Sequence, residues 1–141
     1  MQQMPLETLR RLRRHELAAV EKAFGEAVAR EAEAEGALCR KHQQLLLEQK
    51  RASDPTADDG AVEAFSRWLP VGRQAIAEAQ QCCQQAAMDR DRIRSALLMA
   101  QAALKAVETL EEQQAGEMKQ ISLRKEQAML DELALRQRSL H

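Results

Sequence analysis

Three cysteines and one histidine come nearest to a chemical site in this sequence: Cys39 with His42, and Cys82 with Cys83. Thiolates and imidazoles bind zinc, and four of them complete its tetrahedral shell. If the chain folds back near residue 57, however, Cys39 lies opposite about residue 75, roughly 12 Å along the axis from Cys82. We therefore predict no metal site and three reduced thiols. A fold-back four residues later would remove this objection.

Catalytic motifs are missing from the sequence. It contains no glycine-rich phosphate loop, no nucleophile elbow and no His–Glu pair with the spacing of metal ligands. The abundant acidic residues are interspersed with basic ones, as on the solvated flank of a helix. His15, His42 and His141 are predicted to be surface residues. We expect neither enzymatic activity nor a cofactor.

A basic block near the N-terminus is the clearest local excess of one charge. It consists of Arg10, Arg11, Arg13 and Arg14, in a chain whose net charge is only −1. The block is either a solvated helix face or a contact for an acidic partner surface. Nucleic acid is not expected, because no stacking aromatic residues accompany the arginines. No run of eighteen apolar residues and no signal-peptide core occur, so we expect a cytoplasmic protein without membrane insertion.

The composition predicts long helices that carry these residues. Aromatic residues make up 2% of the 141-residue chain, while charged residues reach 30%. Pro5 suits the first turn of a helix, and no proline follows before Pro55, so a helix is expected over about residues 6–52. The cluster at 53–60 has the chemistry of a turn. A second helix is expected over about 61–138, and Pro70 either kinks it or begins a new helix after a small break.

Apolar residues recur every seven positions in both predicted helices, which indicates a coiled coil. The pattern predicts an all-α fold: a single two-helix antiparallel coiled-coil hairpin over residues 1–141, with a longer, partly overhanging second helix. With the turn near residue 57, Leu6 lies opposite about residue 108, and residues 108–138 have no internal partner over about 45 Å. The first helix carries Leu17, Phe24, Glu31, Leu38 and Leu45 on one line, and the second carries Ile76, Cys83, Arg90, Leu97, Leu104, Glu111 and Met118.

Large apolar residues gather at the predicted turn. Trp68 is the only tryptophan, and it lies close in sequence to Phe65 and Leu69, with Leu45 to Leu47 on the other side of the turn. These residues either close the end of the hairpin or form a binding knob for a partner, a role in which tryptophan is over-represented.

Two segments resemble a known family. The first opens the first helix, Pro5-Leu6-Glu7-Thr8-Leu9-Arg10-Arg11-Leu12-Arg13. The second combines Lys105-Ala106-Val107-Glu108-Thr109-Leu110 with Arg124-Lys125-Glu126-Gln127-Ala128-Met129-Leu130-Asp131-Glu132-Leu133-Ala134. The closing motif resembles the C-terminal signature of FliJ, the flagellar type III export stalk and chaperone protein. Injectisome proteins of the YscO type have a similar plan.

The resemblance implies a non-enzymatic stalk, similar to the central stalk of rotary ATPases, peripheral at the inner-membrane export apparatus. It implies three partners: the export ATPase hexamer, the cytoplasmic domain of the export gate, and export chaperones. By position, the expected ATPase-facing residues are Arg10, Arg11, Arg13, Arg14 and the stretch Leu123 to Leu135, with Leu123, Leu130 and Leu133. The expected gate-facing residues are Leu45, Leu46, Leu47, Phe65, Trp68, Leu69 and Ile76.

Two other functions remain open from the residues alone. A general coiled-coil adaptor or chaperone would bind an amphipathic partner helix through the overhang. A self-assembling coiled coil would pair the overhang with its own copy, and sedimentation distinguishes that case from a monomer.

Overall fold

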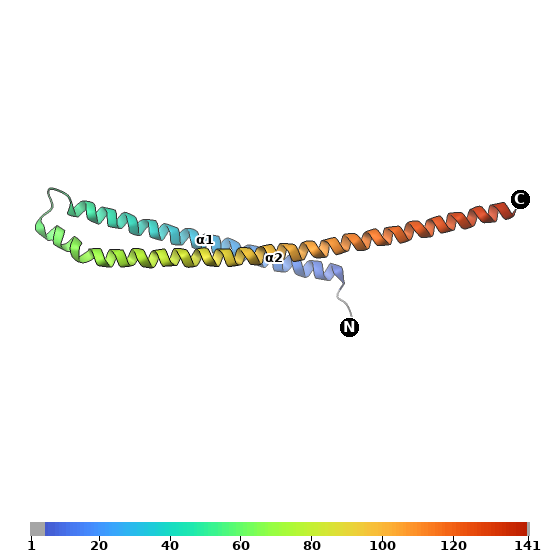
Figure 1. The fold of residues 1–141 in the computed structure, drawn as a ribbon, viewed down its shortest axis with the longest axis horizontal. Coiled ribbons are helices and arrows are strands. Elements are labelled where there is room, and N and C mark those ends of the chain that lie inside the picture. The colour runs from blue at the N-terminus through green and yellow to red at the C-terminus, as the bar shows by residue number, and fades with distance from the viewer. Residues whose placement is uncertain (1–4, 141) are drawn as a thin grey trace. The chain divides into compact units, whose positions relative to one another are not determined.

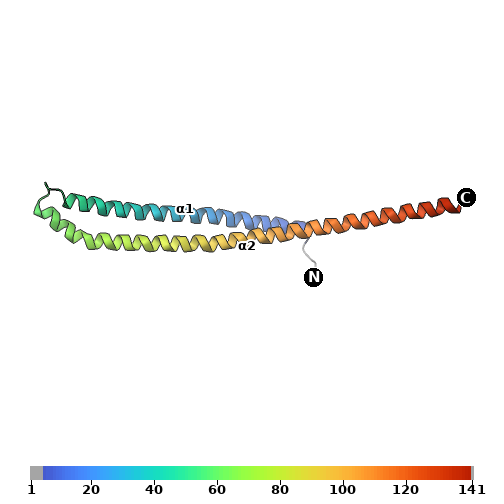
Figure 2. The same cartoon turned by 45° about the horizontal axis from the view of Figure 1, so that its top comes forward.

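The protein consists of two helices in a computed structural model that describes residues 5–140. Helix α1 spans Leu6–Ala52 and helix α2 spans Asp59–Ser139. The two helices pack against each other, and no strand occurs among the described residues (Figures 1 and 2). The predicted all-α antiparallel hairpin with a longer second helix is confirmed. Helix α2 begins two residues earlier than expected and continues without interruption through Pro70.

The turn between the helices is held by two aspartates. The carboxylate of Asp54 accepts hydrogen bonds from the backbone N–H and the hydroxyl of Thr56, at 2.9 and 2.8 Å. These bonds lower the pKa of Asp54 below its usual value, the backbone N–H contributing most. Asp58 caps α2, because its Oδ1 accepts a hydrogen bond from the N–H of Ala61 at 2.9 Å. Asp59 is the first residue of the helix.

The chain divides into two compact units, which are described separately. The turn unit comprises Ala18–Leu98, and the terminal unit comprises the described residues 5–17 and 99–140. Each contains part of α1 and part of α2. Few side chains are fully buried: Ala27 and Ile76 in the turn unit and Val107 in the terminal unit are the buried hydrophobic residues of the described chain. Two helices expose most of their circumference, so a narrow seam is all that they bury.

In the turn unit, the register of the two helices is set by an ion pair between Glu31 and Arg90. In an antiparallel hairpin, the numbers of facing residues add to a constant. That sum is 121 for this pair, whereas a fold-back at residue 57 requires 114. The expected register was therefore wrong by seven residues, or one heptad. Because a shift of one heptad returns the same positions to the seam, the predicted apolar lines still face each other. Leu45 now lies level with Ile76.

The first turns of α2 extend past the end of α1. With the register of the Glu31–Arg90 pair, Ala52 at the end of α1 lies level with about residue 69. The ten or so residues that precede Pro70 therefore have no level partner on α1. Proline has no N–H to donate and its ring crowds the preceding turn, so a bend is expected here. Figures 1 and 2 show the beginning of α2 (green) running at an angle to the part that follows.

In the terminal unit, α1 buries side chains of α2 only as far as about Glu111, although Leu6 at the start of α1 still lies beside Ala115 and Met118. Arg10 donates a hydrogen bond to Glu111 at 2.8 Å, and Val107 is buried one turn earlier. Every described residue from Glu112 to Leu140 is exposed. The unpaired end of α2 was predicted to begin at residue 108. It begins after Glu111 instead, because the turn of the chain lies later than residue 57. We call residues 112–140 the free segment; its helix extends for about 42 Å.

Candidate interaction surfaces

The basic block is not a free positive patch. Arg10 is paired with Glu111, and its side chain is only 30% exposed. Arg11 and Arg13 form ion pairs within α1, with Glu7 at 3.0 Å and with Glu16 at 2.9 Å. These pairs are local and at least partly solvated, so each contributes little to stability and remains available to a partner. Arg10 is a packing residue, whereas Arg11, Arg13 and Arg14 retain accessible guanidinium groups.

A shallow depression lies where the free segment leaves α1. It is lined by Arg10, Arg14, Glu108, Glu111, Glu112 and Ala115. Two polar atoms beneath it, Nε of Arg10 and Oε1 of Glu111, are buried without a hydrogen-bond partner. Two arginines and three glutamates line the depression, so its charges nearly cancel and it does not select strongly for either an anion or a cation.

The apolar residues near the turn differ widely in exposure. Leu46 and Leu47 are 64% and 56% exposed, while Leu45, Phe65, Trp68 and Leu69 are half-buried. Ile76 is buried, with 9% of its surface exposed. A partner cannot reach Ile76 without separating the helices, so we reassign it from the gate-facing set to packing. Val62 and Val71, 51% and 65% exposed, are further exposed apolar residues near the turn, and they were not predicted. They could have been found from the sequence, because Val62 lies three residues before Phe65 and Val71 three residues after Trp68.

Trp68 lies along its own helix, over Gly72. A Cβ at Gly72 would lie 2.6 Å from Cη2 and 2.8 Å from Cζ2 of the indole, closer than real contacts allow. The ring of Phe65 lies beside it, with 6.2 Å between ring centroids. The absence of a side chain at residue 72 therefore allows the indole to rest against the backbone. Trp68 presents one face to the helix and keeps the other half-exposed.

The thiols and His42 form no metal site in the described chain. The shifted register brings Cys39 level with Cys82, so the distance objection raised from the sequence was wrong. Both thiols nevertheless point to solvent, while Cys83 lies half-buried in the seam. Among residues 5–140 no group of three or more His, Cys, Asp or Glu side chains is arranged to hold a metal ion. Burial, then the nearby Glu35, Cys82 and Glu31, raise the pKa of Cys83.

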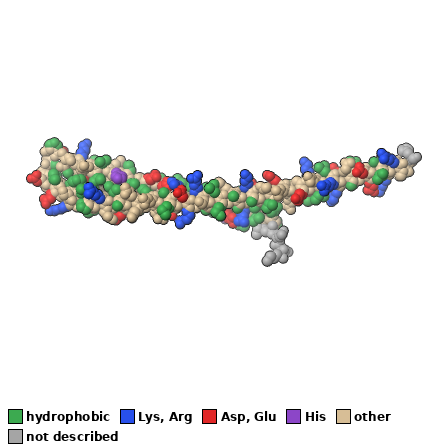
Figure 3. Space-filling view, in the orientation of Figure 1, with side chains coloured by type: hydrophobic (Ala, Val, Ile, Leu, Met, Phe, Trp, Pro, Cys, Tyr) green, Lys and Arg blue, Asp and Glu red, His purple; other side chains and the backbone are tan. Residues whose placement is uncertain are grey.

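The free segment exposes large apolar side chains around much of its circumference. At 100° per residue, Met118 and Met129 fall on one side, Leu123 and Leu130 are rotated by about 120° from them, and Leu135 falls on a third side. Figure 3 shows hydrophobic side chains interspersed with charges of both signs along this end. The exposed apolar residues are Met118, Ile121, Leu123, Met129, Leu130, Leu133, Leu135 and Leu140.

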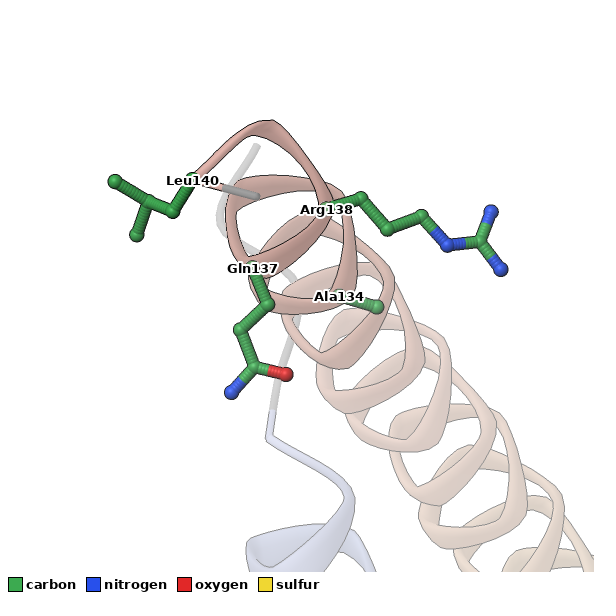
Figure 4. A pocket seen from close by; sticks show the side chains of 4 residues that line it. All are labelled: Ala134, Gln137, Arg138 and Leu140. Atoms are coloured by element: carbon green, nitrogen blue, oxygen red, sulfur yellow. The ribbon is translucent and has the colours of Figure 1, made fainter.

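No enclosed cavity accompanies these side chains at the tip of α2. A surface depression there is lined by Ala134, Gln137, Arg138 and Leu140. Figure 4 shows that the four side chains radiate from the helix and do not converge on a common point. The free segment therefore offers a convex apolar surface, suited to being surrounded by a partner and not to holding a small molecule.

Comparison with protein families decides the assignment. The family model described as Flagellar FliJ protein matches residues 1–140. The chain belongs to the FliJ family. Searches of curated proteins and of solved structures found no significant match. Membership gives the protein a role in flagellar protein export by the type III route, in association with components of that apparatus.

FliJ membership agrees with the helical hairpin and with the sequence resemblance, and it covers both segments on which that resemblance rests. The FliJ family is a non-catalytic component of export. No helix among the described residues is both long and apolar enough to cross a membrane.

Sequence reasoning about this FliJ chain missed the seam ion pairs. Glu31, Arg90 and Glu111 were placed on the seven-residue lines, but they were not matched with opposite charges on the facing helix. The signal was available, because the pairs Glu31–Arg90 and Arg10–Glu111 have position numbers with the same total. Opposite charges on facing lines predict a register where apolar residues do not.

Proposed function

We propose that this protein is a non-enzymatic stalk of the flagellar export apparatus, which couples the export ATPase ring to the cytoplasmic domain of the export gate. The observation that carries the proposal is the free segment, where α2 continues beyond Glu111 with apolar residues on several sides. A helix that is apolar on one side needs one partner helix, but a helix that is apolar on several sides is stable only when surrounded. A ring of subunits provides such surroundings.

The ATPase ring is proposed to surround the free segment. Leu123, Leu130 and Leu133 are 54%, 60% and 53% exposed, and they lie on the sides of the helix away from the continuing seam. Arg11, Arg13 and Arg14 are proposed to contact acidic groups at the edge of the ring. Their present partners are exposed, so exchanging them for residues of the ATPase costs little.

The gate is proposed to bind the apolar surface near the turn. Leu46, Leu47, Val62 and Val71 are its exposed members, and Trp68 offers the half-exposed face of a large rigid ring. Tryptophan is enriched among binding hot spots, which supports Trp68 as the anchor of this surface. Association with export chaperones, at the inner face of the membrane, is part of the same proposal and rests on family membership alone.

Separate variants of the two surfaces test the proposal. Leu130→Asp with Leu133→Asp should abolish stimulation of the purified export ATPase and leave binding to the gate domain unchanged. Leu46→Asp with Trp68→Ala should do the reverse. Leu98→Asp is the matched control, because Leu98 is 59% exposed on the paired part of α2. It should alter neither readout.

An unchanged rate of ATP hydrolysis on adding the wild-type chain would count against the stalk. Binding of a soluble substrate without any effect on the ATPase would instead support a coiled-coil adaptor. The YscO-type alternative is tested by cross-addition: stimulation of an injectisome ATPase but not of the flagellar enzyme would assign the chain to the injectisome.

A further inference from the structure

Four charged residues of the free segment lie on one line of the helix and alternate in sign. They are Glu117, Arg124, Asp131 and Arg138, each seven residues from the next. Residues seven apart follow one line along a coiled-coil helix. The line lies beside the continuing seam of Met118, Ile121, Ala128 and Leu135. It begins at Glu117, beyond Glu111, which is the last residue of α2 that α1 partly buries.

None of these four charges takes part in an ion pair described within residues 5–140. The ion pair described in this segment joins Arg136 to Glu132, on a different face. Of the four, Asp131 accepts a hydrogen bond from the side-chain amide of Gln127, at 3.2 Å. An exposed line of alternating, unpaired charges beside an apolar seam is the arrangement that selects a partner helix and its direction.

Followed in the opposite direction, this line of charges carries the opposite sign at each position, so two antiparallel copies are complementary. When two copies of the free segment are antiparallel, flanking positions of this kind face the same positions of the other copy. Glu117 then meets Arg138 of the second copy, and Arg124 meets Asp131. Each contact occurs twice because of the twofold symmetry. A parallel arrangement in register would place like charges at the same level.

The apolar seam agrees with the same alignment. Met118 comes to lie against Leu135 of the second copy, and these side chains are 64% and 65% exposed in the single chain.

We propose that two copies of this protein associate through their free segments as an antiparallel pair, with the twofold axis between residues 126 and 127. The pair buries Met118, Ile121 and Leu135, which the single chain leaves in water. It describes the chain in the absence of the ATPase, because the ring is proposed to surround the same segment. The inference does not depend on the proposed function, since it is tested with the purified protein alone.

A charge exchange tests both the pairing and its direction. In sedimentation equilibrium, the wild-type chain should show a concentration-dependent dimer. Arg124→Glu and Asp131→Arg should each weaken the dimer about tenfold, because each places two like-charge contacts in the interface. An equimolar mixture of these two variants should recover wild-type association, since every contact is then between opposite charges. The double variant R124E/D131R should recover it as well.

Lys119→Glu is the control, because it makes the same change in net charge on a side of the helix away from the proposed interface. It should leave the dissociation constant within about twofold of wild type. A monomer at all concentrations would overturn the proposal. So would a dimer that either single variant leaves unchanged, or one that the mixture of variants fails to restore.

Discussion

Glu31 and Arg90 show how a single ion pair controls a seam made mostly of small residues. The side chain of Glu31 is 15% exposed, and its Oε2 is buried with no hydrogen-bond partner. Arg90 also contacts the exposed Asp91, at 3.1 Å, and the hydrogen bond to Asp91 is the main cause that raises the pKa of Arg90. Removing the arginine would leave the carboxylate of Glu31 half-desolvated and uncompensated.

We therefore expect Arg90→Met to lower the free energy of unfolding by about 2 kcal/mol. Adding Glu31→Met should recover most of that loss, because two apolar side chains pack well where a charge pair stood. Arg40→Met is the matched control, since its pair with Glu33 at 3.3 Å is exposed, and it should change stability by less than about 0.5 kcal/mol. Urea denaturation followed by circular dichroism measures all three. Equal losses for Arg90→Met and Arg40→Met would contradict the assigned role.

Cys83 illustrates how the seam changes the chemistry of a thiol. Its pKa is raised, first by burial and then by Glu35 and other neighbours, so less of it is thiolate at neutral pH. Cys39 and Cys82 are exposed.

With iodoacetamide at neutral pH, Cys83 should react more slowly than Cys39 and Cys82, because the thiolate is the reacting form. Its rate should continue to rise with pH above the ordinary range of a cysteine pKa. Mass spectrometry of labelled peptides, with Cys82→Ser to isolate its neighbour, measures these rates. Labelling of Cys83 as fast as Cys39 would show that the thiol is neither buried nor suppressed.

At the scale of the element, the beginning of α2 depends on one glycine. The indole of Trp68 occupies the space in which a Cβ of residue 72 would lie. Gly116 is also within α2 but has nothing within 4 Å of the position of a Cβ. The two glycines therefore separate the effect of helix propensity from the effect of contact.

Gly72→Ala should displace the indole and shift the emission of this single tryptophan to longer wavelength, with stronger quenching by iodide. Gly116→Ala should leave the emission unchanged and stabilise the helix by about 0.5–1 kcal/mol. Fluorescence and thermal unfolding of the two variants make the comparison. An unshifted spectrum for Gly72→Ala would mean that Trp68 does not rest on the backbone there.

The elements were largely predictable because their signals are local. The heptad spacing predicted two helices, and Asp54-Pro55 with the residues around it predicted the turn. The register was not predictable from apolar spacing, since a slip of one heptad buries an equivalent set of residues. The unpaired start of α2 before Pro70 was missed for a related reason. The loop was assumed to lie midway between facing residues, whereas the first ten or so residues of α2 precede the level at which α1 ends. Of the candidate surfaces, the free segment was predicted, and Ile76 and Arg10 were assigned to binding without knowledge of their burial.

At the scale of the whole molecule, the free segment contributes surface and little stability. Deleting residues 119–141 should therefore change the free energy of unfolding of the monomer by less than about 1 kcal/mol, because these side chains bury almost nothing. The helical signal of the truncated chain should fall in proportion to its length. Chemical denaturation at low protein concentration tests this, and a large loss of stability would show that the segment packs on the rest of the chain.

The Arg10–Glu111 pair also determines a length. It marks the last level at which α1 buries side chains of α2, so the projecting part of the terminal unit is measured from this contact and not from the turn. Re-pairing Arg10 one heptad along α2 would change that projection by about 10 Å. The length of the projection is thus set by where Arg10 and Glu111 pair, and insertions in the turn leave it unchanged as long as this ion pair is kept.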